Sequence, residues 1–336
     1  MLKDRIVSTL RFFDLQDLPL TLLELHRYLL AGTEQLRKLI TPQWELVGSS
    51  NGQAQTADVD SIIKCLDEEC SGIVEQKNGF YCLAGRASII DRRLANYLYG
   101  IRRERRIKKY IGGLRYLPFV RGAALAGSQA MGQQKQTSDI DLLIIVDPQY
   151  LWLARTAVTA YFQILGKRRH GKRVADRFCL NHYFAGVKNV NELRNLYTAW
   201  EYAKLRPLVY SPTIIDYQQK NAGWIREFFP NFEPFSGYQR PGPGYAAPAY
   251  AGRPFFEKEG KFRGGADAAV VQKISERLLS GGFGRRLEQK LKSWQLPNIR
   301  QEEFILVRED ELSFHPQSKQ KELLEKFFTS ADYPVS

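Results

Sequence analysis

The sequence lacks any long apolar run and any closely spaced pair of cysteines. No stretch of about twenty apolar residues occurs among the 336 residues, so no membrane-spanning helix is predicted. The four cysteines stand in apolar contexts without a Cys-x-x-Cys pair, which indicates neither a disulfide framework nor a zinc site. The first residues lead into an amphipathic stretch rather than a signal peptide, so we expect a reducing, cytoplasmic location.

Acidic charge is scarce relative to basic charge. The chain holds 49 Lys and Arg against 36 Asp and Glu, which gives a net charge of +13. This balance favours polyanionic partners such as nucleotides or nucleic acid, although many proteins of similar charge bind neither. With 44% apolar and 12% aromatic residues, a chain of this length predicts two or three domains with well-packed cores.

Residues 1–86 predict a small helical module that ends in a β-hairpin. Three amphipathic helices are expected, the second opened by a capping box and the third between 60 and 71. The pair Asn78 and Gly79 predicts the turn of the hairpin that follows. Three helices followed by a hairpin resemble a winged helix, which is a DNA-binding unit. Because the third helix is rich in Asp and Glu, we expect a packing or dimerisation role for it rather than contact with DNA.

Residues 87–118 predict one long basic helix that links this module to the next domain. Its first half carries an apolar stripe, whereas positions 102–115 hold seven Lys and Arg and only one Glu. Such a run of charges is commonly the solvated face of a helix. Because nearly all of its charges are positive, contact with nucleic acid or a triphosphate is an equally good interpretation.

Two acids, Asp139 and Asp141, stand at the start of a strand that is apolar as far as Val146. At the two-residue period of a strand, both carboxylates point to one face while Ile140 and Leu142 point to the other. Neighbouring carboxylates repel each other and resist burial, so such a pair usually requires a cation. Mg²⁺, which prefers oxygen ligands, is the simplest choice.

A loop of small residues precedes this strand. It runs from Gly127 and Ser128 to Gly132, and Ser138 stands directly before the acids. Glycine lets a backbone turn approach a ligand closely, and the N–H groups of such a turn favour phosphate. A phosphate-binding loop beside a metal-binding acid pair indicates phosphoryl chemistry.

The combined spacing Gly-Ser-x-x-x-Gly, then Ser-Asp-x-Asp and an apolar strand, resembles the signature of the DNA polymerase beta-like nucleotidyltransferase superfamily, above all its minimal and antibiotic-modifying members. The resemblance covers residues 119–184. It implies transfer of a nucleoside monophosphate from an NTP such as ATP to a hydroxyl, with Asp139 and Asp141 as catalytic ligands of two Mg²⁺ ions. The residues that it assigns to the nucleotide are Gly127, Ser128, Gly132 and Ser138.

The resemblance also implies a third acid on the strand that follows the next helix. Asp176 directly precedes that strand, and we assign it as the third catalytic acid. If Cys179 or Asn181 occupies the position instead, the chain departs from the three-acid pattern. His182 on the same strand is either a base or ligand, or a structural histidine among aromatic residues.

The expected fold class is α+β. The winged-helix-like module precedes a mixed-sheet nucleotidyltransferase domain at 119–215 and a mostly helical region at 216–336, with a disordered linker near 236–254. Helices are expected at 192–210 and at 268–294, the latter broken or kinked at Gly281 and Gly282. The apolar side of the latter is expected to cover the domain.

Two functions of different classes remain open at this point. The first is an Mg²⁺-dependent nucleotidyltransferase, whose acceptor is an RNA, a protein or a small molecule. The second is a non-catalytic winged-helix regulator, or a toxin–antitoxin-type component, whose transferase-like domain only binds nucleotide.

Overall fold

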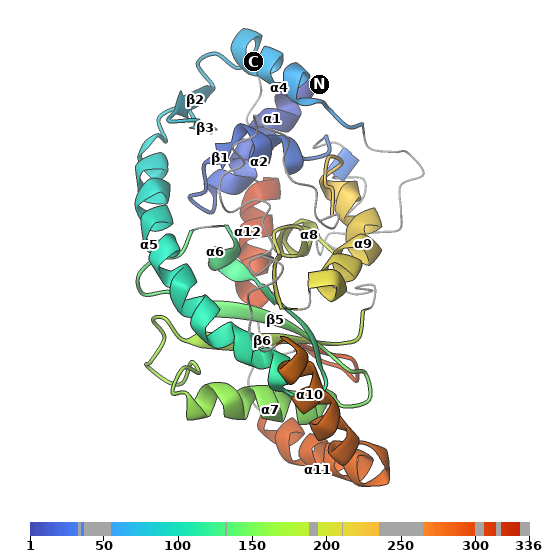
Figure 1. Ribbon diagram of the computed structural model, residues 1–336. Coiled ribbons are helices and arrows are strands. Elements are labelled where there is room, and N and C mark those ends of the chain that lie inside the picture. The colour runs from blue at the N-terminus through green and yellow to red at the C-terminus, as the bar shows by residue number, and fades with distance from the viewer. Residues whose placement is uncertain are drawn as a thin grey trace.

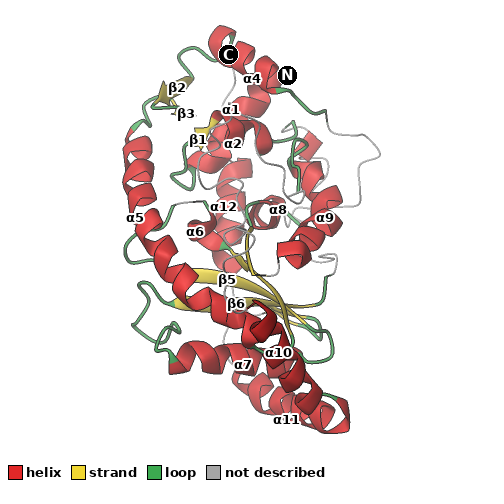
Figure 2. Cartoon of the chain, in the orientation of Figure 1, coloured by secondary structure: helices red, strands yellow, loops and turns green. Residues whose placement is uncertain are grey.

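The computed structural model combines helices with one six-stranded and one three-stranded sheet (Figures 1 and 2). The chain is therefore a mixed α and β protein with a mixed sheet, as expected. Gly132 and the predicted linker near 236–254 lie outside the described residues. The residues that the structure describes are 1–32, 35–36, 55–131, 133–187, 194–209, 211–234, 265–299, 306–313 and 317–329.

Three helices of the described part of the N-terminal module lie beside a small sheet. The predicted capping box is present, because Thr21 and Glu24 each accept a hydrogen bond from the other's backbone N–H. Asn78 and Gly79 both adopt positive φ and join two paired strands, which confirms the predicted hairpin. A further strand was not expected from the sequence, and it gives the order β1-β3-β2. The elements are α1 (Leu2–Asp14), β1 (Leu20–Thr21), α2 (Leu22–Arg27), α4 (Val59–Glu68), β2 (Val74–Lys77) and β3 (Phe80–Leu83).

A long helix, α5 (Ser88–Ile111), joins the module to the large sheet and runs along one side of the molecule (Figure 1). It passes into a 3₁₀ turn, η1 (Gly112–Tyr116). Ile107 and Ile111 are fully buried against the large sheet, whereas Leu98 is 65% exposed. The predicted long helix is thus confirmed, but only part of its apolar stripe is packed.

The large sheet has the strand order β7-β4-β5-β6-β9-β8. Strand β4 is antiparallel to both β5 and β7, whereas β5 and β6 are parallel and joined by helix α7 (Leu151–Ile164). A short helix, α6 (Gly127–Ala130), lies between β4 and β5. The strands are β4 (Val120–Leu125), β5 (Ile140–Val146), β6 (Phe178–Ala185), β7 (Arg206–Val209), β8 (Leu306–Val307) and β9 (Glu311–Ser313).

The helix predicted at 192–210 is wrong at its end. Helix α8 (Leu196–Ala203) is followed by β7, which pairs with β4 at one edge of the sheet. Pro207 has no N–H to continue a helix, and an edge strand tolerates it because that side needs no further partner.

The two faces of the large sheet are covered by different helices. Ile144 and its even-numbered neighbours on β5 pack with α7 and with the C-terminal helices α10 (Gly265–Leu279) and α11 (Gly281–Ile299). Leu143 and Ile145 pack with α8, α9 (Ser211–Phe228) and α12 (Gln317–Thr329). The alternation places Asp141 on this second face, as the two-residue period predicts.

The N-terminal module packs directly on this second face. The ring of Phe13 lies 4.7 Å from that of Trp200 on α8, and the ring of Phe12 lies 5.4 Å from that of Phe327 on α12. The N–H of Ala31 donates to the carbonyl of Phe228 at the end of α9. One hydrophobic core therefore runs from α1 and α2 into the sheet.

The predicted apolar side of α10 does not cover the domain. Val270, Ile274 and Leu278 are 54%, 55% and 70% exposed. The packed side carries Gln272, which donates to the carbonyls of Leu117 and Val120. This part of the prediction is wrong for α10, whose packed side combines these hydrogen bonds with the buried Ala268 and the partly buried Leu279. On α11, Leu287 and Leu291 of the predicted apolar side do pack against the sheet core.

Glu276 strengthens the same attachment of α10. Its carboxylate accepts from the N–H of Phe119 at 2.7 Å and forms an ion pair with Arg121 at 2.6 Å. The predicted break within 268–294 is confirmed, because α10 ends at Leu279 and α11 begins at Gly281, whose φ is +72°. Within the described ranges, no helix has the length and apolar character needed to cross a membrane.

Candidate metal centre and phosphate loop

The loop after β4 brings its backbone against one of the two acids. Gly127 opens α6 with φ +59°, and a Cβ at this position would come within 3.0 Å of Asp141 Cγ and closer still to a carboxylate oxygen. Real Cβ atoms do not make such contacts, so a side chain here would displace the Asp141 carboxylate, and the positive φ also favours glycine. The N–H of Ala126 donates to the Asp141 carbonyl at 3.0 Å, which ties the loop to β5.

Ser138 closes the turn that leads into β5. Its hydroxyl accepts from the N–H of Lys135 at 3.1 Å, and its own N–H donates to the Lys135 carbonyl at 3.0 Å. The Ser138 carbonyl accepts from the N–H of Asp176 and from the guanidinium of Arg103. The structure thus places Ser138 as a support of the acid pair, and Ser128 beside Gly127 at the start of α6.

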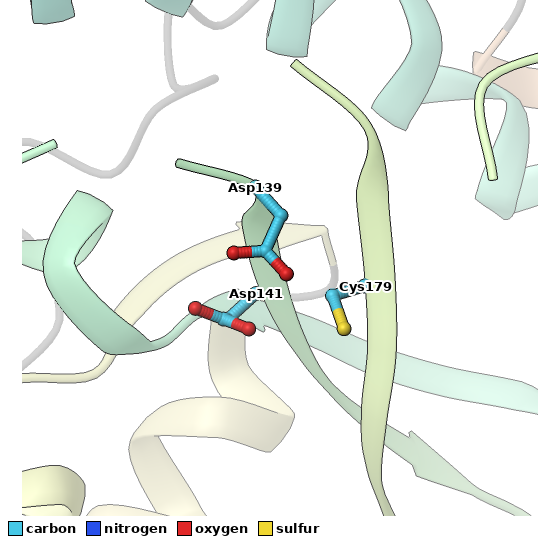
Figure 3. Close-up of side chains that lie close together, drawn as sticks. All are labelled: Asp139, Asp141 and Cys179. Carbon is cyan, nitrogen blue, oxygen red and sulfur yellow. The ribbon is translucent and has the colours of Figure 1, made fainter. Parts of the chain in front are cut away.

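Asp139, Asp141 and Cys179 form a compact group of potential ligands. One ligand atom from each lies within 4.8 Å of the others. Figure 3 shows the two carboxylates side by side at the start of β5 and the sulfur of Cys179 on the neighbouring strand. Asp141 and Cys179 are register partners in the parallel pair β5–β6. The pairing of strands therefore fixes which residue of β6 stands beside the acids.

The environment of Asp141 opposes its ionisation. Burial, then the charges of Asp139 and Glu201, raise its pKa to about 7, against the opposing effect of Lys204 and Arg169. A divalent cation would reverse this balance, because it favours the charged form of both carboxylates.

Burial, together with the charge of Asp141, also raises the pKa of Cys179 to about 12. Its thiol therefore stays protonated at neutral pH unless a cation displaces the proton. A thiol is a poor ligand for Mg²⁺, which prefers oxygen, but a good one for softer ions.

A guanidinium already lies between the first acid and the thiol. Arg169 Nη1 donates to Asp139 Oδ2 at 2.6 Å and to Cys179 Sγ at 3.3 Å. The backbone N–H of Arg169 donates to the Phe178 carbonyl, which fixes its loop beside β6. The Arg169 side chain is 45% exposed, so it can turn away into solvent. The site thus attracts a cation, and Arg169 would compete with a metal for Asp139.

An ion pair at the C-terminal end of α8 acts on the pKa of Asp141. Lys204 is 8% exposed and forms an ion pair with Glu201 one turn earlier. The charge of Glu201, then burial, raises the pKa of Tyr197 well above its ordinary value. The only sequence signal for this group was an acid and a lysine within an otherwise apolar and aromatic helix.

Asp176 is not brought together with the other two acids. Its carboxylate forms ion pairs with Arg103, at 2.7 Å, and with Arg106, and it accepts from the hydroxyl of Tyr99 at 3.1 Å. Arg103 is 1% exposed. This acid therefore fastens the loop before β6 to helix α5, and its charge is offset there.

Two further candidate residues from the sequence, Asn181 and His182, lie on β6. The backbone of Asn181 belongs to β6, while its side chain lies outside what the structure describes. His182 is 9% exposed and lies 3.0 Å from a carboxylate oxygen of Glu311 on β9. Its ring also lies 4.4 Å from that of Phe184. These contacts fit the structural role that an aromatic environment suggests for His182.

Comparisons with protein-family models, with curated proteins and with solved structures gave no significant match to this chain.

Proposed function

We propose that the protein is a nucleotidyltransferase that moves a nucleoside monophosphate from an NTP, such as ATP, to a hydroxyl and releases pyrophosphate. The observation that carries this proposal is the contact of Asp141 with the glycine loop. Gly127 lies against Asp141, so the loop backbone stands beside the two carboxylates that could hold a metal ion, and phosphate chemistry needs a loop and a metal site together.

The donor set fits one Mg²⁺ ion. Asp139 and Asp141 supply two carboxylates, and Mg²⁺ is commonly held by one or two carboxylates together with water and substrate phosphates. The thiol of Cys179 stands beside Asp141, where the three-acid pattern would place another carboxylate, so the described residues give less support to a second ion. When bound, Mg²⁺ would neutralise charge on the phosphate oxygens during an in-line displacement.

The reaction would proceed by attack of the acceptor hydroxyl oxygen on the α-phosphorus. The bond from that phosphorus to the oxygen bridging the β-phosphate breaks, and pyrophosphate leaves with the electron pair. Asp141, ionised in the presence of a metal ion, would accept the hydroxyl proton or orient the hydroxyl. Gly127 and Ser128 would bind the β- and γ-phosphates through the loop backbone.

Arg169 would change partners during substrate binding. In the structure it bonds to Asp139 and Cys179. A metal ion at Asp139 would repel the guanidinium, and the triphosphate of an incoming NTP would offer it a bidentate alternative. Arg169 would thereby exchange a carboxylate for phosphate oxygens.

The test is label transfer from each α-³²P-labelled NTP, with Mg²⁺ and a cell extract as the source of acceptors. Asp139→Asn and Asp141→Asn should each lower the transfer rate by at least about a hundredfold, because each removes a metal-binding charge. Asp91→Asn is the matched control, since the side chain of Asp91 is 60% exposed and its ion pair among the described residues is with Lys77 on β2 of the N-terminal module. Transfer by either site variant at the rate of the parent protein would refute the assignment.

One observation favours the alternative of a non-catalytic regulator. The helices α1, α2 and α4 followed by β2 and β3, with the sheet order β1-β3-β2, support a winged-helix-like module. The exposed residues of α4 include Asp60, Asp67 and Glu68, which would repel DNA phosphates. Binding of a DNA duplex without labelling of any acceptor would favour the regulator.

A further inference from the structure

Two basic segments that are about 60 residues apart in the sequence meet beside the candidate site. Lys109 on α5 and Lys167 on the loop before β6 place their ammonium groups 5.7 and 5.1 Å from the centre of the same ring, that of Tyr110. Asp176, on the loop side, binds Arg103 and Arg106 on α5. The helix and the loop therefore form one continuous surface, which we call the basic surface.

The basic surface carries little opposing charge. The sequence from 99 to 116 contains one acid, Glu104, and the sequence from 163 to 178 contains one, Asp176. Glu104 forms an ion pair with Arg206, and Asp176 is held by two arginines. The exposed basic residues of the two segments are Arg102, Arg105, Arg106, Lys108, Lys109, Arg169, Lys172 and Arg173.

The basic surface leads to the acid pair. Arg169 belongs to the same loop as Lys172 and Arg173, and its guanidinium contacts Asp139. From Arg102 to Lys109 the surface extends about 10 Å along the helix, at 1.5 Å for each residue. A polyanion lying on α5 and the loop would thus have one end at Asp139 and Asp141.

We propose that the basic surface binds a single-stranded nucleic acid whose terminal hydroxyl is the acceptor of the nucleotidyl group. This inference rests on the proposed function and names its acceptor class. The surface has more cations than the triphosphate of one NTP can neutralise. Most of them are arginines, which bind phosphate in a bidentate manner.

A protein acceptor fits this surface less well. Protein interfaces are centred on buried aromatic or apolar anchors and are depleted of charge at their core. The basic surface instead presents cations along a helix and a loop, which suits contact with successive phosphates independently of sequence. Its one central aromatic ring, Tyr110, is already flanked by two lysines.

Binding of a fluorescently labelled 20-nucleotide RNA, measured by anisotropy over a range of salt concentrations, tests the surface without requiring catalysis. The variant Arg102→Glu/Arg105→Glu/Lys109→Glu should bind at least about tenfold more weakly at 0.1 M salt. The slope of log affinity against log salt should become shallower by about two, since roughly 0.7 is lost for each single-strand phosphate contact. The loop variant Lys172→Glu/Arg173→Glu should act in the same direction.

The matched control changes the same number of charges elsewhere. Arg285, Arg286 and Lys290 are exposed on α11, which packs on the face of the sheet opposite to that of Asp141, and their replacement by Glu should leave the salt slope unchanged. Because all the substituted residues are exposed, thermal unfolding should stay close to that of the parent protein. Equal weakening by the control, or no weakening by the α5 and loop variants, would overturn the proposed surface.

Label transfer to an oligonucleotide tests separately whether the nucleic acid is the acceptor. The parent protein should attach the label of an α-³²P-labelled NTP to the 20-nucleotide RNA or to a DNA of the same sequence, and a blocked 3′ end should prevent this. A labelled acceptor of another class in cell extract, with both oligonucleotides bound but unlabelled, would overturn the nucleic-acid acceptor alone. No label on any acceptor would overturn nucleotidyl transfer itself, whatever the binding result.

Discussion

Gly127 lies so close to Asp141 that a side chain at position 127 would clash with the carboxylate. The carboxylate of Asp141 fills the position of a Cβ at Gly127, and the positive φ of Gly127 is itself unfavourable for other residues. The glycine loop and the strand that carries the acid pair are therefore built as one unit. The raised pKa of Asp141 is a consequence of this burial, and it makes the site sensitive to pH.

Metal binding should strengthen as the pH rises from 6 to 8. Asp141 has a pKa of about 7 instead of the ordinary 3.8, and a metal ion binds only its ionised form. Below pH 7 the apparent affinity for Mn²⁺, used as a probe for Mg²⁺, should fall up to about tenfold for each pH unit. Calorimetric titration at pH 6, 7 and 8 measures this. An affinity that is the same at all three values would contradict the prediction.

The raised pKa of Asp141 also determines whether the free energy of unfolding of the metal-free protein rises or falls with pH. Between about pH 4 and pH 7 the unfolded chain releases the proton of Asp141, while the folded chain retains it. The folded state then binds more protons than the unfolded state, so this residue lowers the free energy of unfolding as the pH rises through that range. Asp141→Asn should remove this contribution to the slope.

Some residues of the site could be predicted from sequence, and others could not. The shared face of Asp139 and Asp141 follows from the two-residue period of a strand alone. The place of Cys179 depends on the register of β5 against β6, and the place of Arg169 depends on the path of a loop. Neither is a local property of the sequence. Asp176 was chosen as the only acid near the strand, but its carboxylate pairs with arginines of α5.

Helix α10 illustrates how packing can differ from an apolar pattern. Ala268, Gln272 and Glu276 face the sheet region; they are four residues apart and lie on one face, and Leu279 at the end of the helix packs against the same core. The apolar residues Val270, Ile274 and Leu278 lie outside this face and are exposed. An amphipathic pattern predicts the helix, but not which side of it meets the domain.

A pair of isoleucine substitutions tests this orientation. Ile274→Ala should change the free energy of unfolding by less than about 0.5 kcal/mol, because the side chain is 55% exposed. Ile144→Ala, at a fully buried position of β5, should cost about 2–5 kcal/mol through lost burial and a cavity. Urea unfolding of both variants measures the difference. Comparable losses for the two would show that the side chain of Ile274 is packed.

Long elements were predicted well, and short strands were not. The capping box at Thr21, the Asn78-Gly79 turn and the break at Gly281 are local signals, and all three occur where expected. Strands β1 and β9 have only two and three residues, which is too short to show a period. They exist because β3 and β6 offer them backbone partners.

At the scale of the whole molecule, one core joins the N-terminal module to the face of the sheet that carries the acids. Phe13, Trp200 and Tyr28 form an aromatic cluster in which each ring lies within 6.1 Å of the next. Helices α8, α9 and α12 contribute to the same core. The module therefore helps to position α8, whose Glu201 and Lys204 set the charge around Asp141.

The basic surface on the outer side of the molecule completes this arrangement. Helix α5 extends from the module to the sheet, and Asp176 links it to the loop that carries Arg169. Nucleotide and acceptor would then approach the acid pair from different elements, the glycine loop and the basic surface.

The position of the radioactive phosphate tests the central claim most directly. With purified protein, Mg²⁺ and an acceptor from cell extract, an α-³²P-labelled NTP should leave its label on the acceptor, while a γ-³²P-labelled NTP should release its label as pyrophosphate. Asp139→Asn and Asp141→Asn should abolish both signals. Label on the acceptor from the γ-phosphate, or transfer that persists in both variants, would contradict nucleotidyl transfer at this site.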